Sequence, residues 1–343
     1  MLDMKSIISK DKRCWTAEKA SEWYGRIRQP FGCNFLPSSA VNSIEMFQSR
    51  SFDRDTICKE ISLCAQTGYN CVRVFLPYVV YRQEKDSFLN NLRWFIEVLK
   101  ESSLKIVPVL FDDCGKEPVY GAQASPEPLV HNGVWACSPD KEQRLCDFPQ
   151  YKEYVQTIVS AYAHDESVLF WDLYNEPGNG GRKSKSFYLL QKAFEWAREA
   201  VPDQPLTACV WGMGFVDDEE IVKMDLYSLE NSDILTFHQY CDDKKLKNYI
   251  DSLKELGYPV VCTEWMARNF NSTFSNCLPV FAKEKVGCIN WGLVNGRTQT
   301  HIPWGYDRSQ GEPKLWFHDL FRQDYSPYDE KEIETIKKFV SGL

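Results

Sequence analysis

The sequence predicts a single (β/α)8 barrel, and two patterns carry that prediction. Short apolar runs recur about eight times along the 343 residues, alternating with longer segments that have the period of an amphipathic helix. The runs are continuously apolar rather than alternating, which is typical of parallel strands buried on both faces. An open doubly wound sheet is the main alternative. That fold would carry a glycine-rich turn after its first strand, and the segment FGCNFLPSS has no GxGxxG motif.

Eight segments rich in Val, Ile, Leu, Phe or Cys are the predicted strands. They are Phe31–Leu36, Asn70–Leu76, Lys105–Phe111, Val168–Tyr174, Pro205–Trp211, Ile234–Tyr240, Pro259–Trp265 and Gly287–Leu293. Apolar residues at helical spacing predict helices between the strands. The clearest stripes contain Ile57, Ile61, Cys64 and Ala65 before Gly68; Phe88, Leu92, Phe95, Ile96 and Leu99; Leu190, Ala193, Phe194 and Ala197 before Pro202; and Leu246, Ile250 and Leu253 before Gly257.

No linker divides the chain, so residues 1–343 are expected to form one domain. Two segments are additions to the predicted barrel. Residues 1–30 precede the first strand and are expected to cover the bottom of the barrel. Residues 112–148 form a long insertion after the third strand, and it includes the motif HNGVW at His131–Trp135. Such an insertion would emerge at the C-terminal face, where the active sites of these barrels lie.

Composition excludes several classes of function. The net charge of −8 (40 Lys and Arg against 48 Asp and Glu) does not suit binding to nucleic acid or anionic lipid. No run approaches the roughly 18 apolar residues that a membrane helix needs. The 13 cysteines include no CxxC pair, and the five histidines include no HExxH motif, so we expect neither a metal nor another cofactor. The many unpaired cysteines, and an N-terminus without the apolar core of a signal peptide, favour a cytoplasmic location. The oligomeric state stays open.

Polar and aromatic residues gather where the predicted strands end. The carboxyl ends of barrel strands meet at one rim, so these residues are the candidate site. They are Arg73, Asp112, Asp113, Asn175, Glu176, Trp211, His238, Tyr240, Glu264 and Trp291. Aromatic residues make up 14% of the chain, which suits a site that binds the flat faces of sugar rings.

Glu176 and Glu264 are the central pair. They end the fourth and seventh strands, which lie across the barrel from each other, so their side chains can face one another. Two facing carboxyl groups are the arrangement that glycoside hydrolysis uses: one group protonates the departing oxygen, and the other attacks the anomeric carbon.

Other strand-end residues could assist this pair. Arg73 and Tyr240 could donate hydrogen bonds to Glu264, Asn175 could hold the 2-hydroxyl of the sugar, and Trp291 could form an apolar floor. Structural roles remain open for several residues: an ion pair for Arg73, core packing for Trp211 and Trp291, burial for His238, and capping or cation binding rather than substrate contact for Asp112 and Asp113. His164 and His318 fall in helical patterns and are expected to be surface or packing residues.

These motifs carry a family resemblance. The tripeptides NEP, HQY and TEW and the tryptophan of the eighth strand resemble the clan A retaining glycosidases, above all glycoside hydrolase family 5, the cellulase family. The resemblance runs from Asn34 through Trp304, and the flanking segments are similar to bacterial proteins labelled cellulase-family hydrolase or 1,4-β-xylanase. It implies that Glu176 is the acid/base and Glu264 the nucleophile. It assigns the supporting roles to Arg73, Asn175, His238, Tyr240 and Trp291.

The sequence departs from family 5 at the end of the third strand, where the family usually has a histidine and this chain has FDDC. His131 in the insertion is a candidate replacement. The expected function is hydrolysis of a β-linked oligosaccharide or polysaccharide of the xylan, glucan or mannan type, through a covalent glycosyl-enzyme. A non-catalytic carbohydrate-binding barrel and a transglycosylase remain as alternatives. An aldolase-type barrel would need a lysine at a strand end, and none has one.

Overall fold

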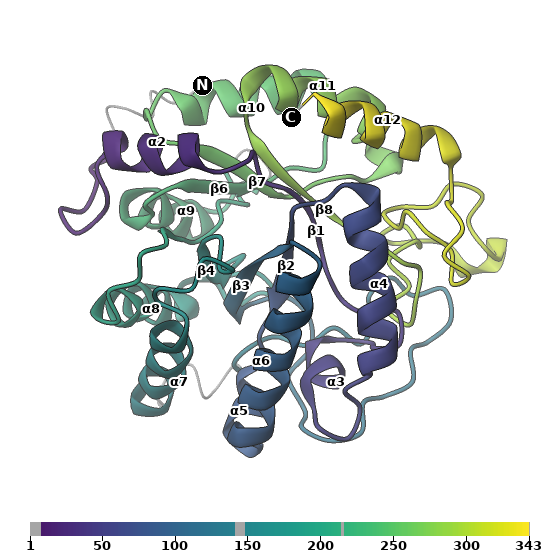
Figure 1. Cartoon of the computed structure of the whole chain (residues 1–343), viewed down its shortest axis with the longest axis horizontal. Helices are drawn as coiled ribbons and strands as arrows, with labels where there is room; N and C mark the ends of the chain where they lie inside the picture. Colours follow the sequence, from purple (N-terminus) through teal and green to yellow (C-terminus); the bar gives the residue numbers. More distant parts are fainter. Residues whose placement is uncertain (1–7, 141–147, 214–215, 343) are drawn as a thin grey trace.

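The computed structural model describes residues 8–140, 148–213 and 216–342, and it confirms the (β/α)8 barrel (Figure 1). All strands are parallel, and neighbours pair in the order β5, β4, β3, β2, β1, β8, β7, β6. The strands are β1 Phe31–Asn34, β2 Cys71–Phe75, β3 Lys105–Asp112, β4 Trp171–Asn175, β5 Leu206–Thr207, β6 Leu235–His238, β7 Val260–Glu264 and β8 Gly287–Trp291. The barrel closes between β5 and β6, where the N–H of Val210 donates to the carbonyl of Thr236 at 2.9 Å.

The helices surround this barrel. They are α2 Ala17–Arg26, α3 Ser43–Phe47, α4 Arg54–Thr67, α5 Tyr78–Gln83, α6 Lys85–Glu101, α7 Phe148–Ala161, α8 Phe187–Glu199, α9 Glu219–Asn231, α10 Asp243–Lys254, α11 Phe274–Glu284 and α12 Glu330–Ser341, with short 3-10 turns η2 Lys183–Ser186, η3 Arg268–Phe270 and η4 Arg308–Gln310. The four predicted apolar stripes lie on α4, α6, α8 and α10. Gly68 ends α4 with φ of 99°, a left-handed conformation that favours glycine. Within the described residues, no helix is both long enough and apolar enough to cross a bilayer.

The fifth strand is shorter than the predicted Pro205–Trp211. The N–H of Ala208 donates to the hydroxyl of Ser232 at 3.2 Å instead of to a neighbouring strand, and a buried carboxylate binds the N–H of Trp211. The side chain of Asp225 on α9 accepts hydrogen bonds from the backbone N–H groups of Trp211, Gly212 and Met213, at 3.2, 2.9 and 2.6 Å. These donors therefore do not enter the sheet. The chain leaves the barrel early, and this exit places Trp211 beside the cavity described below.

Residues 8–30 cover the bottom of the barrel, as predicted, while residues 1–7 lie outside the described part. Ala20 on α2 packs against the N-terminal ends of the strands, in a cluster with Cys71, Val107, Leu169, Phe170, Ile234, Val261 and Ile289. Asp233 anchors this segment. Its carboxylate accepts from the N–H of Trp15 at 2.8 Å and from the N–H of Leu206 at 2.9 Å, and it pairs with Arg198 at 3.1 Å.

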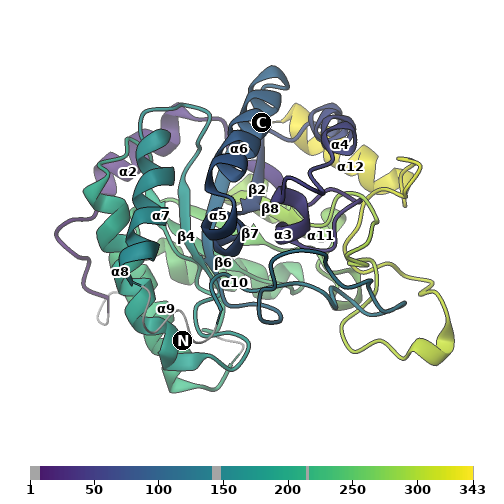
Figure 2. The same cartoon turned by 90° about the horizontal axis from the view of Figure 1, so that it is seen from below.

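The long loops after β3 and β8 lie together at the opposite end of the barrel (Figure 2). The N–H of Leu129 donates to the Gln299 side chain at 2.8 Å, and the N–H of Asn132 donates to the carbonyl of Thr298 at 2.8 Å. The insertion after the third strand therefore reaches the C-terminal face, as predicted; its residues 141–147 lie outside the described part.

Asp233→Ala is expected to lower the free energy of unfolding by about 3 kcal/mol, because it leaves the half-buried Arg198 without its ion-pair partner and two backbone donors without their acceptor. Asp203→Ala is the control, since the Asp203 side chain is 74% exposed and should change stability by no more than about 0.5 kcal/mol. Urea denaturation of both variants measures the difference. Equal stability of the two would contradict the anchoring role of Asp233.

Candidate active site

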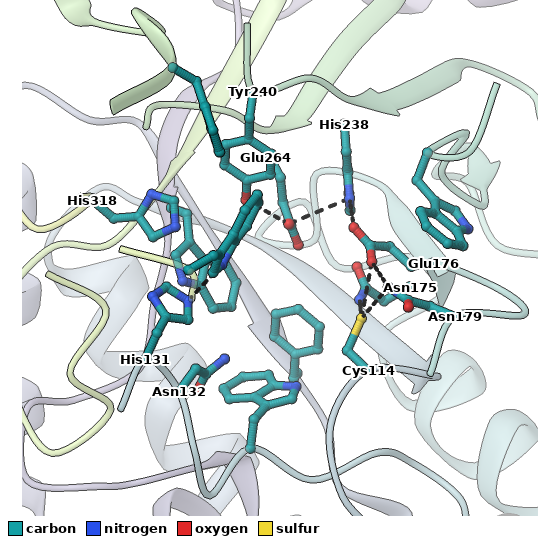
Figure 3. A pocket seen from close by; sticks show the side chains of 16 residues that line it. Cys114, His131, Asn132, Asn175, Glu176, Asn179, His238, Tyr240, Glu264 and His318 are labelled. Atoms are coloured by element: carbon teal, nitrogen blue, oxygen red, sulfur yellow. Dashed lines mark hydrogen bonds and ion pairs between the residues drawn. The ribbon is translucent and has the colours of Figure 1, made fainter. Parts of the chain in front are cut away.

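A cavity of about 600 Å³ opens at the C-terminal ends of the strands (Figure 3). Its volume is within the range typical of small-molecule sites. Eight of the predicted site residues line it: His131, Asn175, Glu176, Trp211, His238, Tyr240, Glu264 and Trp291. The other lining residues were not among the predicted site residues; they are Phe75, Cys114, Asn132, Trp135, Asn179, Phe270, Trp304 and His318.

The two glutamates face each other around His238. A carboxylate oxygen of Glu176, one of Glu264 and a ring nitrogen of His238 all lie within 4.8 Å of one another. Nδ1 of His238 is 2.7 Å from Glu176 Oε1 and 3.4 Å from Glu264 Oε2. The separation fits a retaining mechanism, in which the carboxyl groups are about 5–5.5 Å apart, and it is too short for the water of an inverting one.

Glu264 is held by two further donors. Nη1 of Arg73 lies 2.9 Å from its Oε1, and the hydroxyl of Tyr240 donates to its Oε2 at 2.9 Å. Arg73 is completely buried, and it also pairs with Asp172 at 2.8 Å and donates to Asn175 Oδ1 at 2.6 Å. Arg73 therefore lies behind Glu264 and fixes its orientation without lining the cavity.

Glu176 leaves β4 in a left-handed backbone conformation, with φ of 42°. A residue other than glycine rarely adopts this conformation, and such strained residues cluster at functional sites. The thiol of Cys114 donates to Glu176 Oε2 at 3.1 Å, and the Asn179 amide donates to the same oxygen. The backbone N–H of Glu176 donates to Cys209 Sγ at 3.1 Å. Its carbonyl accepts from the N–H of Asn179 at 3.0 Å, so every polar group of this residue is engaged by its neighbours.

The two carboxyl groups differ in their pKa directions. Burial raises the pKa of Glu264, and the charge of Glu176 adds to this effect, although His238 and Arg73 oppose it. Burial also acts to raise the pKa of Glu176, but hydrogen bonds from His238, Cys114 and Asn179 outweigh it and lower the pKa below its ordinary value. Because two close carboxylates resist ionising together, the pair titrates as one unit.

Three aromatic rings form an apolar floor below the carboxyl groups. Trp135 contacts Phe75 and Trp291 edge-on, with ring centroids 4.9 and 5.6 Å apart. Trp211 lines the cavity by the Glu176 loop, because its Nε1–H donates to the carbonyl of Pro177 at 3.2 Å. These surfaces suit the C–H faces of sugar rings, as expected for Trp291.

Asp112 and Asp113 lie behind the cavity wall, so their predicted contact with substrate hydroxyls is not supported. Asp112 accepts from Asn175 Nδ2 at 2.8 Å and from Trp135 Nε1 at 2.8 Å. Burial raises its pKa to about 7. Asp113 accepts from the hydroxyl of Tyr174 at 2.9 Å and from the N–H of Gly178 at 2.6 Å. Both aspartates position the strand ends around the site.

His131 lines the cavity, but both ring nitrogens are engaged. Its Nε2 accepts from Trp304 Nε1 at 3.1 Å, so its Nδ1 carries the hydrogen and donates to the carbonyl of Ile302 at 2.6 Å. Burial lowers its pKa to about 4, which keeps it neutral. Near the third strand end it is Cys114, not His131, that contacts Glu176. His318 lies in a loop and not in a helix; it is 1% exposed, as a packing residue would be, and it also lines the cavity. His164 is exposed, as expected.

Glu176, His238 and Glu264 are also the group of donors, among the residues that the structure describes, whose spacing could hold a metal ion. Both oxygens of Glu264 already accept hydrogen bonds, and one of them contacts the positive charge of Arg73. A cation beside that guanidinium would be repelled, so this arrangement suits proton transfer better than metal binding.

A family model described as Cellulase (glycosyl hydrolase family 5) matches residues 38–296, more than half of the chain. The chain belongs to glycosyl hydrolase family 5. The family is the one that the sequence motifs predicted. No curated protein matches the sequence.

Solved structures with the same fold include several from family 5. The GH5_18 protein of Streptomyces cattleya, in complex with GlcNAc, is 14% identical with a TM-score of 0.62, over 92% of this chain and 80% of that one. The exo-β-1,4-mannosidase Op5Man5 of an Opitutaceae bacterium is 16% identical with a TM-score of 0.64, over 97% of this chain and only 62% of that one. The endo-1,4-β-D-mannanase of Thermotoga petrophila is 14% identical with a TM-score of 0.56, over 92% and 100% of the two chains.

Arg73→Met is expected to lower the free energy of unfolding by roughly 3–5 kcal/mol, because it leaves the buried Asp172 without its positive partner. Glu264→Gln should not lower it, because burial raises the pKa of Glu264 and the ionised carboxylate is therefore costly in the folded state. Denaturant unfolding at pH 7 compares the two, with the exposed Arg26→Met as control. A loss below about 1 kcal/mol for Arg73→Met would show that Asp172 does not need its partner.

Proposed function

We propose that this family 5 hydrolase is a retaining β-glycosidase, with Glu264 as the nucleophile and Glu176 as the acid/base. The observation that carries the proposal is the pair of carboxyl groups within 4.8 Å of each other, each with a different set of donors. Glu264 lies between Arg73 and Tyr240, two donors that stabilise a carboxylate poised for attack. Glu176 receives weaker donors, a thiol and an amide, beside His238.

In the first step, a carboxylate oxygen of Glu264 attacks the anomeric carbon while Glu176 protonates the departing oxygen. The pKa of Glu176 lies below its ordinary value in the free site, which opposes its role as an acid. A glycosidic oxygen beside Glu176 is an acceptor, so it favours the protonated carboxyl. In the second step, Glu176 takes a proton from water, and the water oxygen displaces Glu264 from the sugar, which restores the β configuration.

The substrate class that we propose is a β-1,4-linked mannoside. Two of the structural neighbours are a mannosidase and a mannanase by name, which supports testing this class before xylan or glucan chains. Rates of hydrolysis of aryl β-glycosides and oligosaccharides of the mannan, xylan and glucan types decide among these three substrate classes. The same assays with and without an added sugar acceptor separate hydrolysis from transglycosylation, since both use one covalent intermediate.

Glu264→Ala is expected to reduce turnover of an aryl β-mannoside by roughly 10⁴-fold or more, because no group remains to form the covalent intermediate. Glu176→Ala should slow that intermediate's breakdown, and added azide should restore the rate and give a β-glycosyl azide. Rate assays and NMR of the azide product make the measurement. An α-configured product from Glu176→Ala, or an active Glu264→Ala variant, would falsify the assignment.

Cys114→Ala is expected to move the alkaline limb of the kcat/KM profile upward by roughly half a pH unit, because Glu176 loses a donor that lowers its pKa. Cys114→Ser keeps a donor and should leave the limb near its wild-type position. The exposed Cys58→Ala is the matched control. If Cys114→Ala and Cys114→Ser give the same kcat/KM profile against pH, the thiol does not lower the pKa of Glu176.

A further inference from the structure

The position of Glu176 defines the direction of a bound glycan in the cavity. Glu176 protonates the departing oxygen, so the leaving group lies on its side and the sugar under attack lies beyond it, over the aromatic floor. Figure 3 shows three labelled side chains across the pocket from Glu176: His131, Asn132 and His318. A glycan that extended past the attacked sugar would have to pass these residues.

Hydrogen bonds between two loops close this end. Trp304 Nε1–H, from the loop after β8, donates to Nε2 of His131, from the loop after β3. The His131 ring donates in turn to the carbonyl of Ile302, and the N–H of Asn132 donates to the carbonyl of Thr298. The closed end is therefore built from both loops and is fixed by their mutual contacts.

The ring of Tyr240 lies between the nucleophile, Glu264, and the closed end of the cavity. The hydroxyl of Tyr240 contacts Glu264 at 2.9 Å, and the ring of Tyr240 packs against Trp304 and His318, with centroids 5.2 and 5.5 Å apart. Tyr240 therefore links the nucleophile directly to the rings that close this end.

Two buried polar atoms at this end have no partner among the described residues. They are Oδ1 of Asn132 and Nε2 of His318. The other nitrogen of His318, Nδ1, donates to the carbonyl of Met266 at 2.5 Å, which leaves Nε2 as a bare acceptor. Buried polar atoms without partners are costly and uncommon, and two acceptors at the blind end of a sugar site match the hydroxyl donors of a terminal sugar.

We infer that the protein is exo-acting: it binds the non-reducing terminal sugar of a short β-linked chain in this blind pocket and releases it as a monosaccharide. Asn132 and His318 accept hydrogen bonds from that sugar's hydroxyl groups. This inference rests on the proposed function and adds to it the mode of action and two residues that bind the terminal sugar.

The test uses β-1,4-mannotetraose and the same tetrasaccharide methylated at the terminal O4, with a matched pair of cellotetraoses. The wild type should release monosaccharide from the uncapped chain and cleave the capped chain at least about 100-fold more slowly, because a methyl group has no room in the pocket. Chromatography of early products makes the measurement. Cleavage of both chains at equal rates into internal fragments would overturn the exo mode while leaving the retaining mechanism intact.

If neither series is cleaved, the hydrolytic function fails but the pocket can still be tested by calorimetry with the same pairs. Selective binding of the uncapped chain supports the blind pocket. Equal affinity for the capped and uncapped chains, or no binding of either chain, would contradict the blind pocket.

The roles of Asn132 and His318 are tested with an aryl β-glycoside that the wild type cleaves. Asn132→Ala and His318→Ala should each raise KM about 10-fold or more, with a smaller change in kcat, and the exposed His164→Ala should change neither. Deoxy substrates give a second measurement that survives a poorly folded variant. The wild type should be substantially less active on at least one substrate that lacks a single hydroxyl group. Full activity on every such deoxy substrate would contradict the proposed hydrogen bonds.

Discussion

The buried guanidinium of Arg73 is the interaction on which the site depends. Its charge lies between Asp172 on β4 and Glu264 on β7, at 2.8 and 2.9 Å, with no surface exposed to solvent. Removing these charges from water is costly, and only close pairing with good geometry offsets the cost. The barrel interior therefore has one stable arrangement of these side chains, and the orientation of Glu264 follows from it. The chemistry depends on the packing of the strands.

The same dependence explains how much of the fold the sequence could predict. Strands buried on both faces must be continuously apolar, so each of the eight appears as a short hydrophobic run, and the helices follow from their period. The fifth strand was the exception. Its early end comes from side chains on and just after α9: the hydroxyl of Ser232 binds the N–H of Ala208, and Asp225 binds the N–H of Trp211. A contact between residues more than ten positions apart leaves no periodic signal.

The site likewise contains residues that the sequence could predict and residues that it could not. Glu176, His238 and Glu264 were predictable because the ends of parallel strands converge on one rim whatever the loops do. Position at a strand end does not fix direction, however, and Asp112 turns sideways to bind Asn175 and Trp135 rather than a ligand. Cys114 had a usable signal, since it directly follows the two aspartates at that strand end.

Residues from the loops carried no comparable signal. His318 and Trp304 reach the cavity only because the loop after β8 packs on the loop after β3, and nothing local in the sequence specifies that contact. Strand ends thus supply the two glutamates, while the two loops supply His131, Asn132, Trp304 and His318 to the cavity wall. The loops contact each other, but Cys114 also binds Glu176 and Trp304 packs on Tyr240, so a change in either loop reaches the carboxyl pair as well. The barrel is shared with solved structures at only 14–16% identity, and we expect the proposed substrate choice to be decided in these loops.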